Sequence, residues 1–324
     1  MKRIRFLVAL AAVLAFWSAA PAPAATTLTI VIFNAPSLGD FLPPAVKAKH
    51  LDEANGLDIS FPERTPDAYA TEFNSGEFEL GGSGAVLTVG LADLRGVKVA
   101  YLFNLFDYWG AVVTQRPEIK TLADLKGKQL AAARGTTNYS MFAWFAQQKG
   151  LSSDSYSVVN TATPGLVGYA LADRADAVQL WEPAYSVLIA KKPEIRTLDL
   201  DIAPTWRGTA HTAAIPYLGV AAQWSWIEKH PELIAPLYRT YEAAAAWVTA
   251  NPVEAAAIIA GAKADDEQRK SLENLIRNNT RLGMNVAPAA QLEDGIRAVY
   301  RAGMAVGALS AMPSEASIYA KDIR

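Results

Sequence analysis

The chain has 324 residues, in which 30 lysines and arginines nearly balance 32 aspartates and glutamates, and it contains no cysteine. The near-neutral charge argues against nucleic acid or an acidic membrane surface as a partner. Without cysteine there is no disulfide framework and no lipid-modified cysteine, so the fold must depend on its apolar core. The core of a chain of this length is usually divided between two domains.

Residues 1–25 are predicted to be a secretory signal peptide. Three basic residues lie within the first five, an apolar run continues to about Trp17, and Ala22-Pro23-Ala24 has the form of a cleavage site. The apolar run is shorter than the roughly 20 residues of a membrane span, and a retained anchor is the alternative. Cleavage removes three of the 30 basic residues and leaves 27 against 32 acidic ones. We therefore expect a soluble protein of a bacterial periplasm that is not a lipoprotein.

Strands and helices alternate along the first hundred residues. The run "TTLTIVIFNAP" (26–36) is apolar and rich in β-branched residues, which is typical of a strand buried on both faces. A helix with Pro43 or Pro44 in its first turn follows, and then another strand and another helix. The glycines of "GGSGAVL" (81–87) are expected to open a further helix, and "VKVAYLFNLF" (97–106) is a strand. This alternation predicts an α/β fold with parallel strands.

The alternation begins again after residue 106. The stretch "WGAVVTQR" (109–116) is a strand, "KQLAAARGTTNYSMFAWF" (128–145) gives a strand, a turn and a helix, and "ADAVQLWEP" (175–183) is a strand. The last third of the chain is mostly helical, with Asn251 as a predicted N-cap and Pro252 at the first helical position. The sequence therefore predicts two α/β units in series, followed by helices that cover a core.

The stretch "ARGTTNYSMFAWF" (133–145) predicts a helix that begins directly after a buried strand. The first N–H groups of a helix are unpaired, and the helix dipole favours an anion there. A glycine lets the backbone approach a ligand closely, and threonine hydroxyls add donors. The carboxyl end of a strand in an open α/β sheet is also where ligands bind. The stretch is therefore either an anion-binding helix start or a helix that Thr136 or Thr137 merely caps.

Three stretches together resemble a known family. They are "TLADLKGKQLAAARGTTNYSMFAWF" (121–145), "ADAVQLWEP" (175–183) and "YLGVAAQWSWIEKHPELI" (217–234). They are similar to the solute-binding proteins of the ABC-type importers of nitrate, sulfonates and taurine, a family that also includes thiamine-pyrimidine binders. The motifs occur in the family's order, and the resemblance covers residues 28–260. It is specific for the family and says little about the ligand.

The resemblance implies a two-lobe, type II periplasmic binding protein fold with two hinge crossings. Residues 26–105 and 211–324 would form lobe 1, and residues 106–210 would form lobe 2. The crossings would lie near residues 105–108 and 209–213. A ligand would bind between the lobes and draw them closed. The implied partners are an ABC permease and its ATPase, with the binding protein itself a monomer that needs no cofactor.

The resemblance also implies where the ligand would touch the chain. The first strand would end at the ligand, the glycine-rich turn and the threonine turn would each begin a helix there, and a lobe 2 strand would end there. One aromatic residue near the first crossing and one histidine near the second are added as candidates. The candidate ligand-binding residues are Asn34, Pro36, Ser83, Gly84, Phe106, Thr136, Thr137, Trp181, Glu182 and His211.

Glu182 leaves two possibilities open. A carboxylate in a closed cleft is costly unless it is paired. It would meet either an amine of a zwitterionic ligand, such as an amino-sulfonate, or a protein cation such as Arg134 or Arg207. The aromatic residues near the crossings are expected mostly to fill the core. One or two of them in the cleft would favour an organic ligand over bare nitrate.

Metal and enzyme chemistry find little support. The 3 histidines have no metal-ligand spacing. The stretch at 81–87 lacks the third glycine of a dinucleotide-binding loop and the final glycine of a nucleophile elbow. Related pyrimidine-precursor enzymes carry a cysteine-rich motif, which this chain lacks. We expect a non-catalytic protein that captures a small organic anion (a sulfonate, a taurine-like molecule or a carboxylate) or nitrate. An exported enzyme on the same fold and a sensor module for a membrane receptor kinase are the alternatives.

Overall fold

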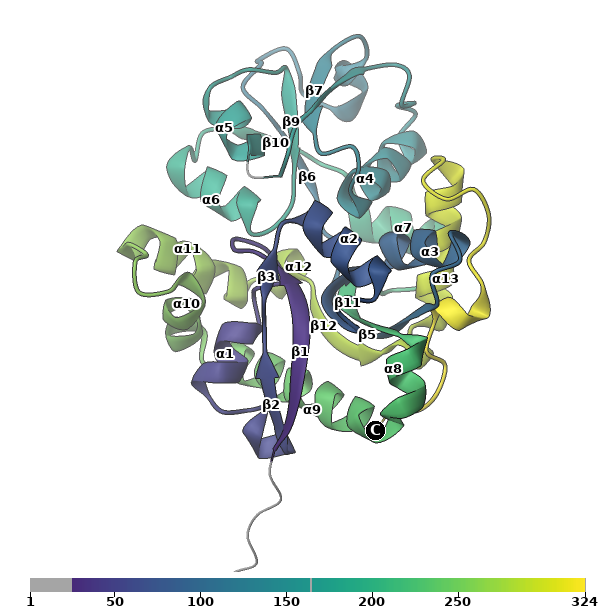
Figure 1. The fold of residues 1–324 in the computed structure, drawn as a ribbon. Helices are drawn as coiled ribbons and strands as arrows, with labels where there is room; N and C mark the ends of the chain where they lie inside the picture. The colour runs from purple at the N-terminus through teal and green to yellow at the C-terminus, as the bar shows by residue number, and fades with distance from the viewer. Residues whose placement is uncertain (1–24, 164, 324) are drawn as a thin grey trace, which may run out of the picture.

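The computed structural model describes residues 25–163 and 165–323, so the predicted signal peptide lies outside the described residues except for Ala25. Two β-sheets lie one above the other, each flanked by helices (Figure 1). We call the larger sheet with its helices lobe 1 and the smaller sheet with its helices lobe 2. This arrangement agrees with the α/β fold class predicted from the sequence.

The sheet of lobe 1 has seven strands in the described part of the chain, in the order β12-β5-β11-β4-β1-β2, with β3 paired to β1. Strands β1, β2 and β4 run parallel, as predicted. The prediction of parallel strands is wrong for β5, because its neighbours β11 and β12 are both antiparallel to it. These two strands come from the last third of the chain. The strands are β1 (Thr26–Phe33), β2 (Leu57–Ser60), β3 (Glu63–Arg64), β4 (Leu80–Ala85), β5 (Val99–Asp107), β11 (Pro216–Gln223) and β12 (Met284–Pro288).

The sheet of lobe 2 has five strands among the described residues, in the order β10-β6-β9-β7-β8. Strand β7 pairs in parallel with β8 and β9, whereas β6 is antiparallel to β9 and β10. The strands are β6 (Ala111–Thr114), β7 (Gln129–Ala132), β8 (Ser157–Asn160), β9 (Ala177–Leu180) and β10 (Arg196–Leu198).

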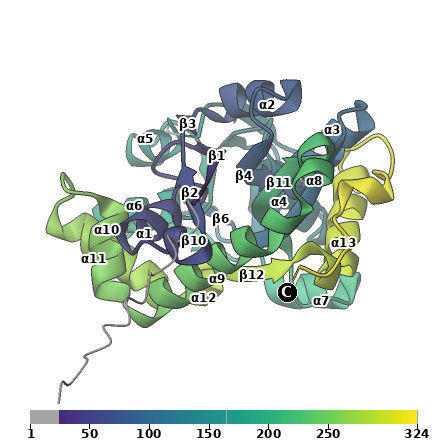
Figure 2. The ribbon, with the colours of Figure 1, turned by 60° about the horizontal axis from the view of Figure 1, so that its bottom comes forward.

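Helices cover both sheets, and α9 to α11 gather beside α1 at one end of lobe 1 (Figure 2). The α-helices are α1 (Pro43–Ala48), α2 (Pro66–Ser75), α3 (Val86–Leu94), α4 (Thr137–Gln148), α5 (Gly165–Leu171), α6 (Ala184–Lys191), α7 (Ile202–Ala210), α8 (Trp224–Lys229), α9 (Ile234–Ala250), α10 (Pro252–Ala260), α11 (Asp266–Arg277), α12 (Asn279–Leu282) and α13 (Glu293–Ala305). Short 3₁₀ turns lie at Glu53–Asn55, Leu122–Leu125, Pro231–Leu233, Ala289–Gln291 and Glu315–Ser317.

Two predicted helix starts need correction. A helix does begin in the glycine-rich stretch, but later than predicted: Gly82, Ser83 and Gly84 belong to strand β4, and α3 begins at Val86. The strand contains Gly81, Gly82 and Gly84 because its neighbours pack so closely that a Cβ at any of these positions would meet a side-chain atom within 3 Å. Pro252 does begin α10, but the side chain of Asn251 makes no cap and instead donates to the Trp247 carbonyl, 2.9 Å away.

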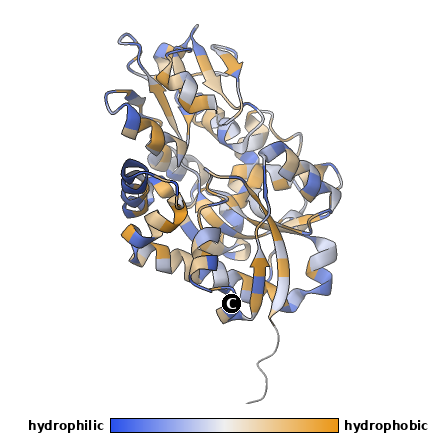
Figure 3. Cartoon of the chain, turned by 60° about the vertical axis from the view of Figure 1, so that its left-hand side comes forward, coloured by the Kyte–Doolittle hydropathy of each residue, from blue (hydrophilic) through white to orange (hydrophobic). Residues whose placement is uncertain are grey.

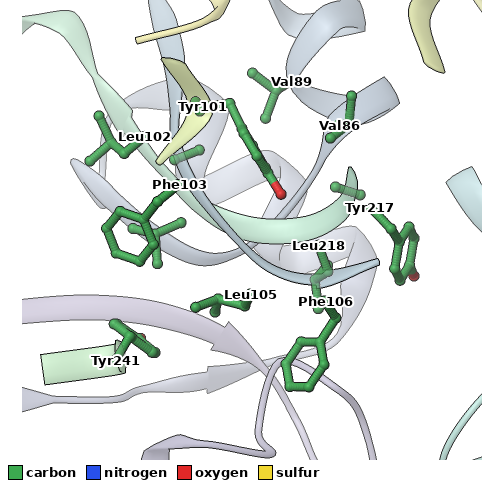
Figure 4. Close-up of a cluster of buried hydrophobic side chains, with 14 of the residues drawn as sticks. Val86, Val89, Tyr101, Leu102, Phe103, Leu105, Phe106, Tyr217, Leu218 and Tyr241 are labelled. Carbon is green, nitrogen blue, oxygen red and sulfur yellow. The ribbon is translucent and has the colours of Figure 1, made fainter. Parts of the chain in front are cut away.

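The core of lobe 1 is built on β5 and β11, whose side chains point to both faces of the sheet (Figure 4). Phe103 and Phe106 are fully buried, and Phe106 meets Phe41 edge to face. On the other face, the Tyr101 hydroxyl donates to the Asn104 side-chain oxygen at 2.7 Å. Hydrophobic residues concentrate on the strands and on the inner faces of the helices (Figure 3).

The chain passes between the lobes twice, and the two passages lie side by side. The first leads from β5 to β6, and the second leads from α7 into β11. The Tyr108 amide donates to the Ile215 carbonyl at 2.7 Å, which joins the two passages. The Asp107 amide donates to the Gly283 carbonyl at 2.7 Å, so the start of β12 is held at the same place. These bonds make the connection between the lobes narrow and well defined.

In the part of the chain that the structure describes, no single helix has both the length and the apolar character needed to cross a membrane. Residues 231–260 meet those two criteria only as a bent pair of helices, with an angle of 115° between them.

The close packing of β11 against β5 gives a first prediction. A Cβ added at Gly219 would lie 2.2 Å from the Phe103 carbonyl oxygen, which is backbone and has little freedom to move. We expect Gly219→Ala to lower the free energy of unfolding by about 3 kcal/mol or more, measured by urea denaturation. Gly208→Ala is the control, because a Cβ at that helical position meets no other atom. It should stabilise the protein by about 0.5–1 kcal/mol. Equal effects of the two substitutions would contradict this account.

Candidate functional site

The start of α4 lies at the end of β7, in lobe 2. The Thr136 hydroxyl is the N-cap: it accepts from the Tyr139 amide at 3.2 Å and donates to the Ala133 carbonyl at 2.8 Å. Thr136 therefore does cap its own helix, which was one of the two predicted possibilities. The first hydrogen bond of the helix proper runs from the Ser140 amide to the Thr136 carbonyl. Before it, the Tyr139 amide is taken by the Thr136 hydroxyl, whereas the amides of Thr137 and Asn138 have no carbonyl partner inside the helix and can meet an anion.

Thr137 and Asn138, the first two residues of α4, are buried and incompletely paired. Their side chains are 6 % and 2 % exposed, yet the Thr137 hydroxyl and the Asn138 side-chain oxygen have no hydrogen-bond partner. The Asn138 side-chain nitrogen donates to the hydroxyl of Tyr217, 2.5 Å away at the start of β11. This bond links lobe 2 to lobe 1. The start of α4 therefore faces lobe 1 and carries polar atoms that the protein itself does not use.

Glu182 lies between β9 and α6, and its carboxylate is enclosed at 1 % exposure. One of its oxygens accepts from Arg281 Nε at 2.9 Å and Nη2 at 2.6 Å, and the other accepts from the Ser186 amide at 3.1 Å. The partner is thus neither Arg134 nor Arg207, the two cations expected from the sequence. Arg281 belongs to α12, which leads into β12 of lobe 1. The ion pair therefore joins the two lobes.

Aromatic rings surround the Arg281 guanidinium, which lies 5.7 Å from the Trp109 ring and 4.9 Å from the Tyr185 ring. The two rings meet each other edge to face at 5.0 Å. Burial raises the pKa of Glu182 above its usual range, while the adjacent Arg281 charge acts in the opposite direction. A cation held over two rings and bonded to a carboxylate is a strong, specific contact between the lobes.

The segment after β1 carries two of the predicted residues, Asn34 and Pro36. Asn34 is partly exposed and Pro36 is exposed, so both are accessible to a ligand. The Ala35 amide donates to the Glu63 carboxylate at 3.4 Å. In the same segment, burial and the nearby Glu63 charge raise the pKa of Asp40 to about 7. This edge of lobe 1 thus combines an accessible amide side chain with two acidic groups.

Ser83 and Gly84 are fully covered by protein atoms. The Ser83 hydroxyl accepts from the Phe33 amide at 2.8 Å, and a Cβ at Gly39 would lie 2.0 Å from its oxygen. The loop after β1 therefore packs directly on Ser83. A Cβ at Gly84 would meet the Ala221 side chain at 2.9 Å, which explains the glycine by strand packing. In this conformation both residues hold β4 to its neighbours.

The three other predicted residues are dispersed. Phe106 is in the lobe 1 core, and Trp181 packs in the lobe 2 core beneath α5 and α6. His211 is exposed at the end of α7 in a left-handed conformation, with φ of 59°. The structure thus brings Thr136 and Thr137 together at one place and Glu182 to an interlobe ion pair. Sequence reasoning missed Asn138 and Arg281. It also missed Gln179 of β9, which is buried with both side-chain polar atoms unpaired, although a polar residue inside "AVQLW" was a visible signal.

A pocket of about 800 Å³ lies at the two chain crossings. Its lining includes Asp107, Trp109, Asp199, Asp201 and Asn285, and it includes no lysine, arginine or histidine. None of the predicted site residues lines it. Burial raises the pKa of Asp107 to about 6, against hydrogen bonds from Asn285 and Asn104. An acidic lining is unsuited to an anion, which favours the start of α4 as the anion site.

Among the described residues, no group of three or more histidine, cysteine, aspartate or glutamate side chains is arranged to hold a metal ion.

A family model described as NMT1/THI5-like matches residues 51–255, which is more than half of the chain. In a comparison with curated proteins, no sequence matches.

The fold is similar to solved structures of binding proteins. The alkanesulfonate-binding protein SsuA of Xanthomonas axonopodis pv. citri, bound to MOPS, has a TM-score of 0.73 at 16% identity, with 93% of this chain and 99% of that chain covered. The periplasmic aliphatic sulphonate-binding protein SsuA of Escherichia coli has a TM-score of 0.68 at 17% identity, with 92% of each chain covered. A Candida albicans gene product with the generic periplasmic binding protein fold has a TM-score of 0.65 at 14% identity, with 93% and 97% covered. At these identities the similarity establishes the fold.

The interlobe ion pair gives a second prediction. Arg281→Met leaves the buried Glu182 carboxylate without its counter-charge and should lower the free energy of unfolding by about 2–4 kcal/mol at pH 8. Since the substitution raises the pKa of Glu182 further, the loss should shrink as the pH falls and the carboxyl group becomes protonated. Adding Glu182→Gln should restore most of the stability. Urea denaturation at several pH values measures both effects.

Arg277→Met is the matched control, because Arg277 is exposed and pairs with Glu273 within a single helix, α11. It should cost only about 0.3–0.5 kcal/mol, with little dependence on pH. A loss for Arg281→Met as small as this would show that the interlobe pair contributes no more than a surface pair.

Proposed function

The chain belongs to the NMT1/THI5-like family, and from this premise we propose that it is the solute-binding subunit of an ABC importer. It would capture a small organic anion, or nitrate, between its two lobes and deliver it to a membrane permease. The SsuA proteins that share its fold bind sulfonates by name, which supports a sulfonate or carboxylate. The division into residues 26–105, 106–210 and 211–324 stays a prediction of the same proposal.

The observation that carries the proposal is the start of α4. It combines the first-turn amides of Thr137 and Asn138, which a helix leaves without a carbonyl partner, with a buried hydroxyl without a partner at Thr137 and a bond to lobe 1 through Asn138. Helix amides and hydroxyls bind anions without any basic side chain. Because the site is at the contact between the lobes, an anion bound there would be enclosed by both lobes. Thr136 and Thr137 are therefore the predicted residues that we place at the ligand.

The roles of the other predicted residues follow from their positions. Asn34 and Pro36 are accessible, so we keep them as proposed contacts to the ligand from lobe 1. Glu182 has its charge satisfied by Arg281, so it serves the contact between the lobes. This removes the main reason to expect a ligand ammonium at Glu182.

A binding role without catalysis agrees with the arrangement at α4. The groups there are amides and hydroxyls, none of which has an adjacent general base. We propose a periplasmic location, a monomeric state, and a permease with its ATPase as partners. Turnover of the bound solute would instead indicate an exported enzyme, and binding to a membrane kinase would indicate a sensor.

Substitution of Thr137 tests the proposal. Thr137→Val keeps the shape of the side chain and removes a hydroxyl that has no protein partner, so the melting temperature without ligand should change by less than about 2 °C. The affinity for the anion should fall about 10- to 100-fold, because a hydrogen bond to a charged group is lost. The ligand comes from a thermal-shift screen of nitrate, alkanesulfonates, taurine and small carboxylates, and calorimetry then gives its Kd.

Thr65→Val is the control, because Thr65 caps α2 by accepting from the Ala68 amide and lies outside the proposed site. It should cost about 1 kcal/mol of stability and leave the affinity unchanged. If Thr137→Val behaves like Thr65→Val, Thr137 only stabilises its helix, and the anion site at α4 is refuted.

A further inference from the structure

Gln179 is a buried amide in the sheet of lobe 2 whose hydrogen-bonding groups are all unused. We propose that Gln179, together with Thr137 and Asn138, binds a carboxamide group of the solute, so that the natural ligand is a small organic acid with a primary amide. This inference rests on the proposed function, because it assigns the chemistry of the same ligand. It adds the Gln179 side chain to the proposed site and requires the solute to carry a primary amide.

The strand register places Gln179 beneath the start of α4. Gln179 is directly opposite Val112 in β6, and the pairing of Val178 with Ala131 brings the next residue, Ala132, beside it. Val112 and Ala132 belong to the cluster that packs under Tyr139 and Phe142 of α4, whereas Val178 packs on the opposite face. Side chains alternate between the faces of a strand, so Gln179 points toward α4. Ala132 is the last residue of β7, directly before the turn that begins α4.

Gln179 is a buried amide with no hydrogen-bond partner at either of its two polar atoms, unlike the other buried amides of the strands. It is 0 % exposed, and neither its Nε2 nor its Oε1 has a hydrogen-bond partner. By contrast, buried Gln223 donates to the Phe73 carbonyl at 2.6 Å, and buried Asn104 bonds Tyr101 and Asn285. Buried polar groups in folded proteins are nearly always paired. The described chain has other exceptions, such as the hydroxyls of Tyr69 and Tyr241. Those at Thr137, Asn138 and Gln179 fall on the start of α4 and on the strand beneath it, which indicates a site whose partner comes from outside the chain.

The chemistry of Gln179 selects the group that it binds. In either orientation of the amide, Gln179 offers both an NH₂ group that donates and a carbonyl oxygen that accepts. A sulfonate or nitrate supplies acceptors only, so it would leave the carbonyl of Gln179 unpaired. A primary carboxamide supplies an N–H beside a C=O and can pair with both groups at once. The Thr137 hydroxyl can donate or accept, and so can serve either end of the same amide.

A charged amine fits less well than a neutral amide. No carboxylate is among the three unpaired side chains, and the nearby Glu182 is already paired with Arg281. An ammonium group would therefore be withdrawn from water without a counter-charge. The acidic group of the solute would instead meet the free amides at the start of α4. Access to this place requires the lobes to separate at the bond between Asn138 and Tyr217, which agrees with capture between two lobes.

Two pairs of isosteric acids test the proposal by calorimetry. Oxamate differs from pyruvate, and succinamate from levulinate, only by an amide NH₂ in place of a methyl group. We expect at least one amide member to bind at least 10-fold more tightly than its methyl ketone. In Gln179→Met this preference should disappear, since methionine has a similar size and no amide. Equal affinities within both pairs, no binding of either amide, or a preference that survives in Gln179→Met would overturn the proposal.

Stability separates a binding role from a structural one. Gln179→Met removes two unpaired buried groups, so the melting temperature without ligand should stay the same or rise. Gln223→Met is the matched control: it removes a buried amide that is bonded, and it should lower the melting temperature by about 2–4 °C without changing any affinity. A fall for Gln179→Met as large as that for Gln223→Met would mean that Gln179 supports the fold instead. If simple sulfonates or carboxylates bind while the amide preference is absent, the proposed function stands and only this inference fails.

Discussion

A polar group that is withdrawn from water must find a partner, and this requirement organises the contact between the two lobes. The Glu182 carboxylate meets it inside the protein, through Arg281 and Ser186. Within lobe 1, the Ser83 hydroxyl meets it by accepting from the Phe33 amide. The groups at the start of α4 do not meet it within the chain. At the contact between the lobes, this requirement separates the paired residues that hold the lobes together from the unpaired ones that we propose meet a solute.

The topology explains why these groups come together. The chain leaves lobe 1 after β5 and returns at β11, and the two passages are bonded through Tyr108 and Ile215. A narrow double connection permits rotation of one lobe on the other, which is the usual basis of hinge closure. The starts of β11 and β12 are both held at this connection. As a result Tyr217 reaches α4 and Arg281 reaches Glu182, so the returning segment supplies the lobe 1 side of both contacts.

Periodicity and turn residues were sufficient to predict the α/β class, most of the strands and the threonine start of α4. The antiparallel strands β11 and β12 were not predictable in this way, because their partner β5 is more than a hundred residues away in the sequence. The glycines before α3 suggested a loop at a helix start, but they lie inside strand β4. They are glycines because close packing against Tyr69 and Ile32 leaves no room for a side chain. Arg281 was missed as the partner of Glu182 for the same reason of distance along the chain. Gln179 was visible in the sequence as a polar residue in an apolar strand, but a binding role could be inferred only once the structure showed that both of its side-chain polar atoms are unpaired.

Closure of the lobes on a bound acid is the central claim, and it is measured most directly by the distance between two labels. The chain has no cysteine, so Glu77→Cys in lobe 1 and Ala172→Cys in lobe 2, both exposed, would take spin labels uniquely. Pulsed electron paramagnetic resonance then gives the distribution of distances with and without the acid that binds most tightly. The account predicts a broader distribution without ligand and a shorter, narrower one with it. Tight binding with an unchanged distribution would contradict capture between the lobes.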